Sequence, residues 1–85
     1  MRTIYKYPIE ITDEQTITMP ECAEIIHVGL DPQGTPCIWA EVITERSLRP
    51  YDVIVAGTGH PLPAGARNNH VGSFVQGSFV WHVFV

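Results

Sequence analysis

Polar and apolar positions alternate along most of the chain, in short runs separated by turn-forming residues. Valine and isoleucine occur nine times each and threonine seven times, whereas alanine and leucine together occur only eight times. β-Branched residues favour strands, and the scarcity of good helix formers argues against helices. The pattern therefore predicts a single all-β domain over residues 1–85, an antiparallel β-sandwich or barrel of about six to seven strands. The expected strands are residues 2–7, 15–19, 24–30, 37–44, 51–56, 70–76 and 79–85.

Two hairpins follow from turn chemistry. In "DPQG", Asp31, Pro32 and Gly34 occupy the positions that a type I turn favours, because proline presets φ and aspartate bonds the turn backbone. This hairpin places Cys37 near Val28, too far from Cys22 for an intrachain disulfide, so both thiols are expected to be reduced. The second hairpin turns at Gly77, whose backbone tolerates a tight turn.

The last strand is apolar on both faces. Phe79, Trp81 and Val83 alternate with Val80 and His82, which suits a central strand or a strand with one face in a subunit contact. As a core residue, His82 should be neutral and hydrogen-bonded, because a buried charge is costly.

Size and composition favour an oligomer. A domain of 85 residues buries a modest share of its surface, and only 16% of its residues are charged, against 45% hydrophobic. A homo-oligomer is therefore expected. The chain contains no apolar run long enough to cross a membrane and no signal-peptide pattern, so a cytoplasmic location and no membrane partner are expected.

Charge is divided unevenly along the chain. Residues 1–45 hold two basic and eight acidic residues, a net charge of −6, whereas residues 46–85 hold three arginines and one aspartate, a net charge of +2. Duplex nucleic acid is disfavoured as a partner, because it needs a broad basic surface. A small anion bound by the second half of the chain remains possible.

The stretch 57–69, "GTGHPLPAGARNN", is the principal candidate site. It follows an apolar strand but lacks the lysine of a P-loop and the helix of a dinucleotide fingerprint, and its prolines remove amide donors. The residues with suitable chemistry are Thr58, His60, Arg67, Asn68 and Asn69, since guanidinium binds phosphate and amides read the edges of a base. The alternative is a connection without function, although loops of this length are uncommon unless functional or disordered.

Arg46 and Arg49 lie in "TERSLRP", which is expected to be another connection. They support the same site if the two loops share one end of the sheet, and are solvated surface residues if they do not. Trp39 is expected to pack in the core rather than to stack on a ligand.

Catalytic and metal-binding motifs are absent from the sequence. Four histidines show neither HxH nor HExxH spacing, and two cysteines cannot build a zinc site, so no metal and no cofactor is expected. No serine or cysteine lies in a nucleophile elbow or beside an evident base in the chain, and enzyme activity is therefore disfavoured.

Three segments, "TIYKYPIEITDEQTITMP", "GTGHPLP" and "GSFVWHVF", together resemble a family of small phage and prophage-encoded proteins classed as a domain of unknown function. The resemblance implies a phage origin and a compact β-rich fold, and carries no activity to any residue. It directs attention to the small phage proteins that act against host immunity, some of which sequester cyclic nucleotide signals.

The resulting hypothesis is a non-catalytic binding protein that captures a small anionic ligand, with a cyclic nucleotide immune signal as the candidate. One alternative is a phage inhibitor that docks on a host defence protein through the acidic residues between 10 and 24, as a nucleic-acid mimic. A third reading is an accessory structural protein of the phage.

Overall fold

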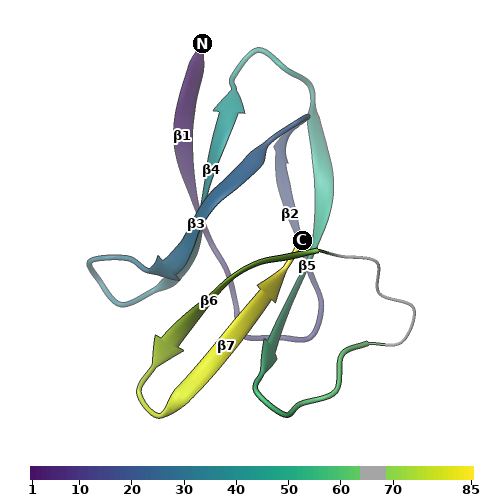
Figure 1. Cartoon of the computed structure of the whole chain (residues 1–85). Coiled ribbons are helices and arrows are strands. Elements are labelled where there is room, and N and C mark those ends of the chain that lie inside the picture. Colours follow the sequence, from purple (N-terminus) through teal and green to yellow (C-terminus); the bar gives the residue numbers. More distant parts are fainter. Residues whose placement is uncertain (64–68) are drawn as a thin grey trace.

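The computed structural model describes residues 1–63 and 69–85, in which seven strands and no helix are found. The strands form two antiparallel sheets, with the orders β1-β4-β3 and β2-β5-β7-β6 (Figure 1). The predicted all-β fold is therefore confirmed. None of the described residues forms a helix long and apolar enough to span a membrane. The strands are β1 (Arg2–Pro8), β2 (Gln15–Pro20), β3 (Glu24–Leu30), β4 (Pro36–Ile43), β5 (Leu48–Gly57), β6 (His70–Gln76) and β7 (Phe79–Phe84).

Both predicted hairpins are present. Between β3 and β4, the amide of Gly34 donates to the carbonyl of Asp31 at 2.9 Å, and Gly34 has a φ of +83°. The carboxylate of Asp31 also accepts from the amides of Gln33 and Thr35, each at 2.9 Å, as its side chain was expected to do. Between β6 and β7, Gln76 pairs with Phe79 across a two-residue turn in which Gly77 has a φ of +58°.

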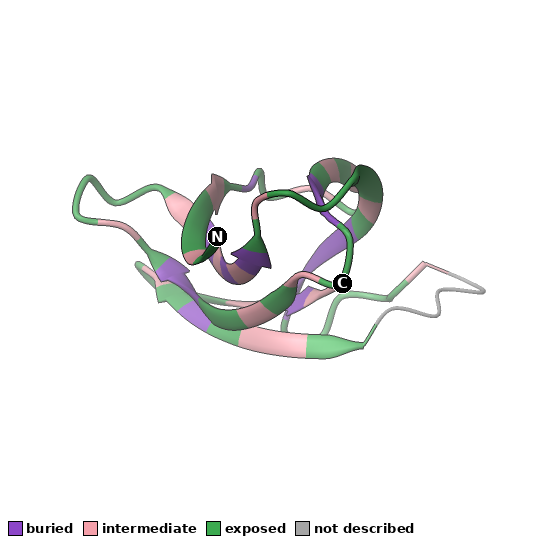
Figure 2. Cartoon of the chain, turned by 90° about the horizontal axis from the view of Figure 1, so that it is seen from above, coloured by how far each residue is buried: buried purple, intermediate pink, exposed green. Residues whose placement is uncertain are grey.

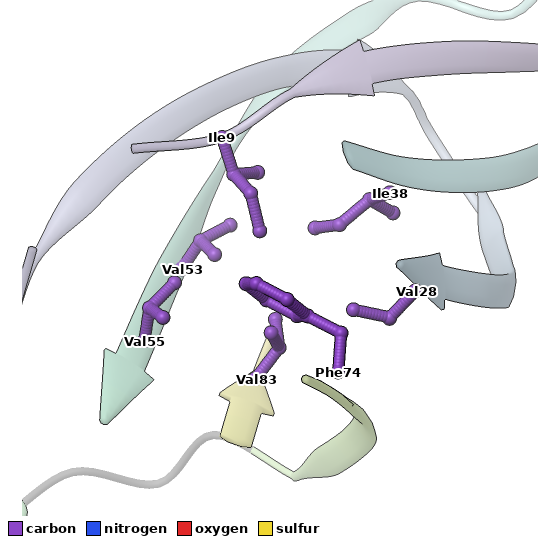
Figure 3. Close-up of a cluster of buried hydrophobic side chains, with 7 residues drawn as sticks. All are labelled: Ile9, Val28, Ile38, Val53, Val55, Phe74 and Val83. Carbon is purple, nitrogen blue, oxygen red and sulfur yellow. The ribbon is translucent and has the colours of Figure 1, made fainter. Parts of the chain in front are cut away.

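The core lies between the two sheets. Phe74 of β6 occupies the middle of the largest cluster of buried side chains and is surrounded by aliphatic residues from both sheets (Figure 3). Buried and exposed positions are mixed along the strands (Figure 2), and in the second half of β5 five successive residues, 53–57, are buried, so both faces of the sheet are covered there. The other members of this cluster are Ile9, Val28, Ile38, Val53, Val55 and Val83.

Strand β6 contains an irregularity that alternation could not predict. Its pairing with β7 shifts between His70 and Gly72, so that one extra residue is inserted on β6. Such a bulge changes which face each following side chain occupies. Val71 packs against the core, and the next residue, Gly72, also approaches the opposite sheet, at Val28 of β3. His70 and Ser73, three residues apart, consequently share the outer face.

Strand β5 begins earlier than the sequence indicated. Residues 48–50 continue the strand, so Arg49 lies on β5 and not in a connection, as the sequence suggested. The first part of β5 pairs with β2 as far as Val53, whereas β7 pairs with β5 only from Ile54 onward. Pro50 is tolerated there because a proline without an N–H group fits a stretch of strand that has a free edge.

The expectation that Trp39 packs in the core needs correction, and the two cysteines differ in burial. Trp39 is only half-buried and lies beside the ring of His27, with 5.0 Å between ring centroids, outside both buried clusters. Neighbouring positions 38 and 40 point into the core, so alternation turns the indole to the other face. Both cysteines are free, as expected, but Cys22 is exposed and only Cys37 is buried, where burial raises the pKa of its thiol.

Candidate functional site

The structure divides the predicted site residues between the two ends of β5. Arg49 is the second residue of β5, whereas Thr58 directly follows its last residue. Eight residues of extended strand lie between them, so nine steps along the strand separate them by about 30 Å. Arg67 and Asn68 lie outside the described residues. The predicted single site is therefore not assembled from Thr58, Arg46 and Arg49, although Arg49 and Asn69 line the same hollow.

Arg49 and Asn69 line an open hollow of about 480 Å3 on the side of the four-stranded sheet that faces the core. It forms because β7 ends opposite Ile54 while β5 continues back to residue 48, which leaves space beside the first half of β5. Residues from the beginning of β6 and from β3 close the sides. The lining residues are Ala23, Ile25, Arg49, Pro50, Tyr51, Asp52, Asn69, Val71 and Val85.

The hollow combines a cation, an aromatic ring and an amide. The guanidinium carbon of Arg49 lies 4.6 Å from the centroid of the Tyr51 ring, which is the geometry of a cation–π contact. The hydroxyl of Tyr51 donates to the carbonyl of Pro20 at 3.0 Å, so the ring is fixed from the other side. Two backbone hydrogen bonds with Val85, at 3.0 and 2.9 Å, hold Asn69 at the rim.

Arg46 does not belong to this group. It lies in the connection between β4 and β5, is exposed, and its amide donates to the carbonyl of Ile43 at 3.1 Å. Its side chain does not line the hollow. Arg46 is thus a nearby arginine that can serve as a control for Arg49.

At the other end of β5, Thr58 belongs to a chain of hydrogen bonds that crosses three strands. Thr58 Oγ1 lies 2.7 Å from Nε2 of His82 on β7. His82 Nδ1 lies 2.9 Å from Oγ of Ser73, which in turn lies 3.1 Å from Nε2 of His70. His82 is half-buried and hydrogen-bonded at both ring nitrogens, which agrees with the expected hydrogen bonding but places it on the outer face and not in the core.

The sequence missed this cluster. Ser73 and His82 are nine residues apart and meet because the hairpin pairs them directly. His70 and Ser73 are three residues apart, which in a regular strand places them on opposite faces. The bulge in β6 instead brings both residues to the same face. The glycine at position 72 was the one local signal in the sequence that could have suggested a bulge.

His60 packs on the protein itself. Its ring lies 6.3 Å from that of Trp81, and a Cβ placed on Gly57 would come within 2.7 Å of its Nδ1. Gly57 leaves room for a close approach to the backbone, and the imidazole of His60 occupies that space.

The residues after His60 border an acidic surface. Asp13 and Glu14 line a second open hollow, of about 520 Å3, together with Thr12 and residues 61–63. Two carboxylates would repel an anion there, so this end of the predicted loop does not suit the predicted ligand.

The acidic residues between 10 and 24 are likewise divided. Glu10, Asp13 and Glu14 precede β2, whereas Glu21 follows it, so about 20 Å of strand lies between them. Among residues 1–63 and 69–85, no group of three or more histidine, cysteine or acidic side chains is placed to hold a metal ion.

Comparison with known protein families gives one match. The family model described as "Domain of unknown function (DUF7352)" matches residues 1–85. No curated protein and no solved structure matches the chain.

Proposed function

The chain belongs to the DUF7352 family over residues 1–85, and we propose that it is a binding protein that captures a small anionic ligand with a planar group, of the nucleotide kind, without converting it. The observation that carries this proposal is the hollow in which Arg49 lies over Tyr51 and which Asn69 also lines. A guanidinium binds a phosphate in a forked arrangement, an aromatic ring stacks on a base, and an amide both donates and accepts.

Size supports a small ligand. The volume of about 480 Å3 falls within the range usual for pockets that hold small molecules, about 300–1,000 Å3. The apolar lining from Ala23, Ile25 and Val71 supplies surface for a base, and Arg49, Tyr51 and Asn69 supply polar groups beside it. Ligand sites typically combine apolar surface with a few polar groups that fix the orientation of the ligand.

Charge favours a phosphodiester over a terminal phosphate. Arg49 is the one lysine or arginine among the described residues that line the hollow. A phosphodiester carries one negative charge, whereas a terminal phosphate at neutral pH carries between one and two. One guanidinium balances the single charge of a phosphodiester, so cyclic nucleotides, whose phosphates are all diesters, fit best.

In the phage setting that the sequence resemblance implies, capture lowers the free concentration of a cyclic nucleotide signal and so counters host anti-phage defence. A cytoplasmic location in the host cell and a homo-oligomeric state are part of this proposal. Light scattering after gel filtration measures the oligomeric state directly, independently of ligand binding.

The test is isothermal titration against cyclic mononucleotides, cyclic dinucleotides and cyclic trinucleotides, with the matching 5′-monophosphates as the comparison. We expect heat for at least one cyclic compound and weaker binding of its monophosphate. Arg49→Ala should lose the binding, and Arg46→Ala should keep it. Absence of heat throughout the panel, or equal loss in both variants, contradicts the proposal.

A further inference from the structure

The outer face of the four-stranded sheet presents a serine between two histidines. Ser73 is exposed, and its Oγ lies 2.9 Å from Nδ1 of His82 and 3.1 Å from Nε2 of His70. Residues 54 and 56 of β5 point to this same face, because they alternate with the core residues Val53 and Val55. The cluster therefore lies on the opposite side of the sheet from the hollow that holds Arg49.

A histidine nitrogen can accept the hydroxyl proton of Ser73 in either tautomer of His82. A neutral histidine has one N–H group and one accepting nitrogen. If His82 carries its proton on Nε2, it donates to Thr58, and Nδ1 accepts the proton of Ser73. If the proton is on Nδ1, His82 donates to Ser73, whose own proton is then available to Nε2 of His70. In either form a histidine nitrogen lies within hydrogen-bond distance of the serine hydroxyl.

Thr58 orients the base. In a serine–histidine–aspartate triad, a third group bonds the far nitrogen of the imidazole and fixes its tautomer and direction. Here the hydroxyl of Thr58, 2.7 Å from Nε2 of His82, is in that position. A hydroxyl lacks the charge that stabilises an imidazolium, so the arrangement favours reactivity toward activated substrates over demanding ones such as amides.

The surroundings are apolar and open. Val75 and Val80 pair directly across β6 and β7, on the same face as Ser73 and His82, and are 63% and 39% exposed. On the other side, the ring of Phe84 lies 5.4 Å from that of His70. An acyl chain of a few carbons can rest on this surface while its carbonyl reaches Ser73.

We propose that Ser73 is a nucleophile and that His82 is its general base. Ser73 accepts the acyl group of activated esters that bear a short apolar chain. This activity goes beyond the proposed ligand capture and uses none of its residues. Oγ of Ser73 bonds to the carbonyl carbon, the bond from that carbon to the alcohol oxygen breaks, and the serine proton passes through His82 to the departing alcohol. Water then attacks the acyl-serine, gives a proton to the same nitrogen, and releases the carboxylic acid as Ser73 regains its proton.

The test uses a fluorophosphonate carrying a short alkyl chain, with peptide mapping by mass spectrometry. The serine Oγ forms a bond to phosphorus as fluoride leaves, and the unaltered protein reports the site without any mutation. Ser73 should react about 100-fold faster than the exposed Ser47 and Ser78, in line with the usual benefit of a positioned base. His82→Phe should remove most of this difference.

Hydrolysis of p-nitrophenyl butyrate provides the second readout. Ser73→Ala should abolish the protein-dependent rate, whereas Ser78→Ala, in the neighbouring turn, should retain it. Equal labelling of all three serines overturns the proposal, as does labelling of Ser73 that persists unchanged in the His70→Phe, His82→Phe double variant. Arg49→Ala should leave both readouts unchanged, so the outcome is independent of ligand capture.

Discussion

Gly72 of β6 lies directly against Val28 of β3, so closely that a Cβ placed on the glycine would be 2.9 Å from both Cβ and Cγ2 of the valine. The contact joins the two sheets at the bulge, where β6 approaches β3. Because the obstructing atoms are the branched base of a buried side chain, they cannot move aside easily.

Gly72→Ala should therefore lower the free energy of unfolding by about 1–3 kcal/mol, the usual cost of adding atoms to a packed interior. Urea denaturation measures this cost. In the Val28→Ala background the same substitution should cost less, because Cγ2 of the valine, one of the two atoms at 2.9 Å, is removed while its Cβ remains. A cost that is the same in both backgrounds would show that Cγ2 of Val28 does not limit position 72.

Asp31 gives the stability a dependence on acid. Its pKa is lowered below its ordinary value of 3.8, first by the amide of Thr35 and then by Lys6, whose Nζ lies 3.0 Å from the carboxylate. A carboxyl group whose pKa falls on folding stabilises the folded state above its unfolded pKa, and this contribution is lost as the pH falls through the folded pKa. The contribution of Asp31 to the free energy of unfolding should thus be fully present above about pH 4 and should decline in more acidic solution.

Asp31→Asn should lower the denaturation midpoint at pH 7. The gap between the midpoints of the variant and the wild type should become smaller as the pH falls below 4. Lys6→Met should keep more of the acid dependence than Asp31→Asn does, because the amide of Thr35 is the larger cause of the shift. Denaturation midpoints measured from pH 2 to 7 test both statements. A difference that stays constant over this range contradicts them.

Ile38 tests the core between the sheets. It is fully buried in the main cluster, whereas Ile26 of the neighbouring strand β3 is 52% exposed. Ile38→Ala should cost about 2–5 kcal/mol of unfolding free energy through lost contacts and the cavity left behind. Ile26→Ala should stay within about 0.5 kcal/mol of the wild type, as surface substitutions usually do. Similar costs at the two positions would contradict the assignment of core and surface.

Arg49→Lys distinguishes charge from shape at the hollow. Lysine keeps the positive charge but lacks the planar fork that binds phosphate and lies over Tyr51. We expect Arg49→Lys to weaken binding of the cyclic nucleotide identified by titration, by about tenfold or more if one bidentate contact is lost. The Arg46→Lys variant is the matched control. Full retention of affinity in Arg49→Lys would mean that charge alone, and not the guanidinium, is recognised.

Strands and turns could be predicted from the sequence because their causes are local. β-Branched residues and alternation produced the seven strands, and Asp31, Gly34 and Gly77 marked the two tight turns. The early beginning of β5 was missed because Pro50 normally ends a strand, and tolerance of that proline depends on which edge is left without a neighbour.

The candidate site was predicted in part. Arg49 and Asn69 were among the residues chosen for their chemistry, and the structure brings them to one hollow, but it places Thr58 at the far end of the same strand. Arg49 and Asn69 line one hollow because of where β7 ends beside β5. That end point depends on strand pairing across the sheet and cannot be predicted from a short stretch of sequence.

What the sequence by itself determined is therefore the all-β character, the two hairpins and the chemical groups available for binding. Tertiary structure alone decided which groups meet. Successive side chains of a strand point to opposite faces of the sheet. One extra residue between His70 and Gly72 is therefore enough to bring His70 onto the same face as Ser73. Because Gly72, which directly follows that extra residue, lies in close contact with Val28 of the other sheet, the position of the bulge depends on packing between distant segments as well as on local preference.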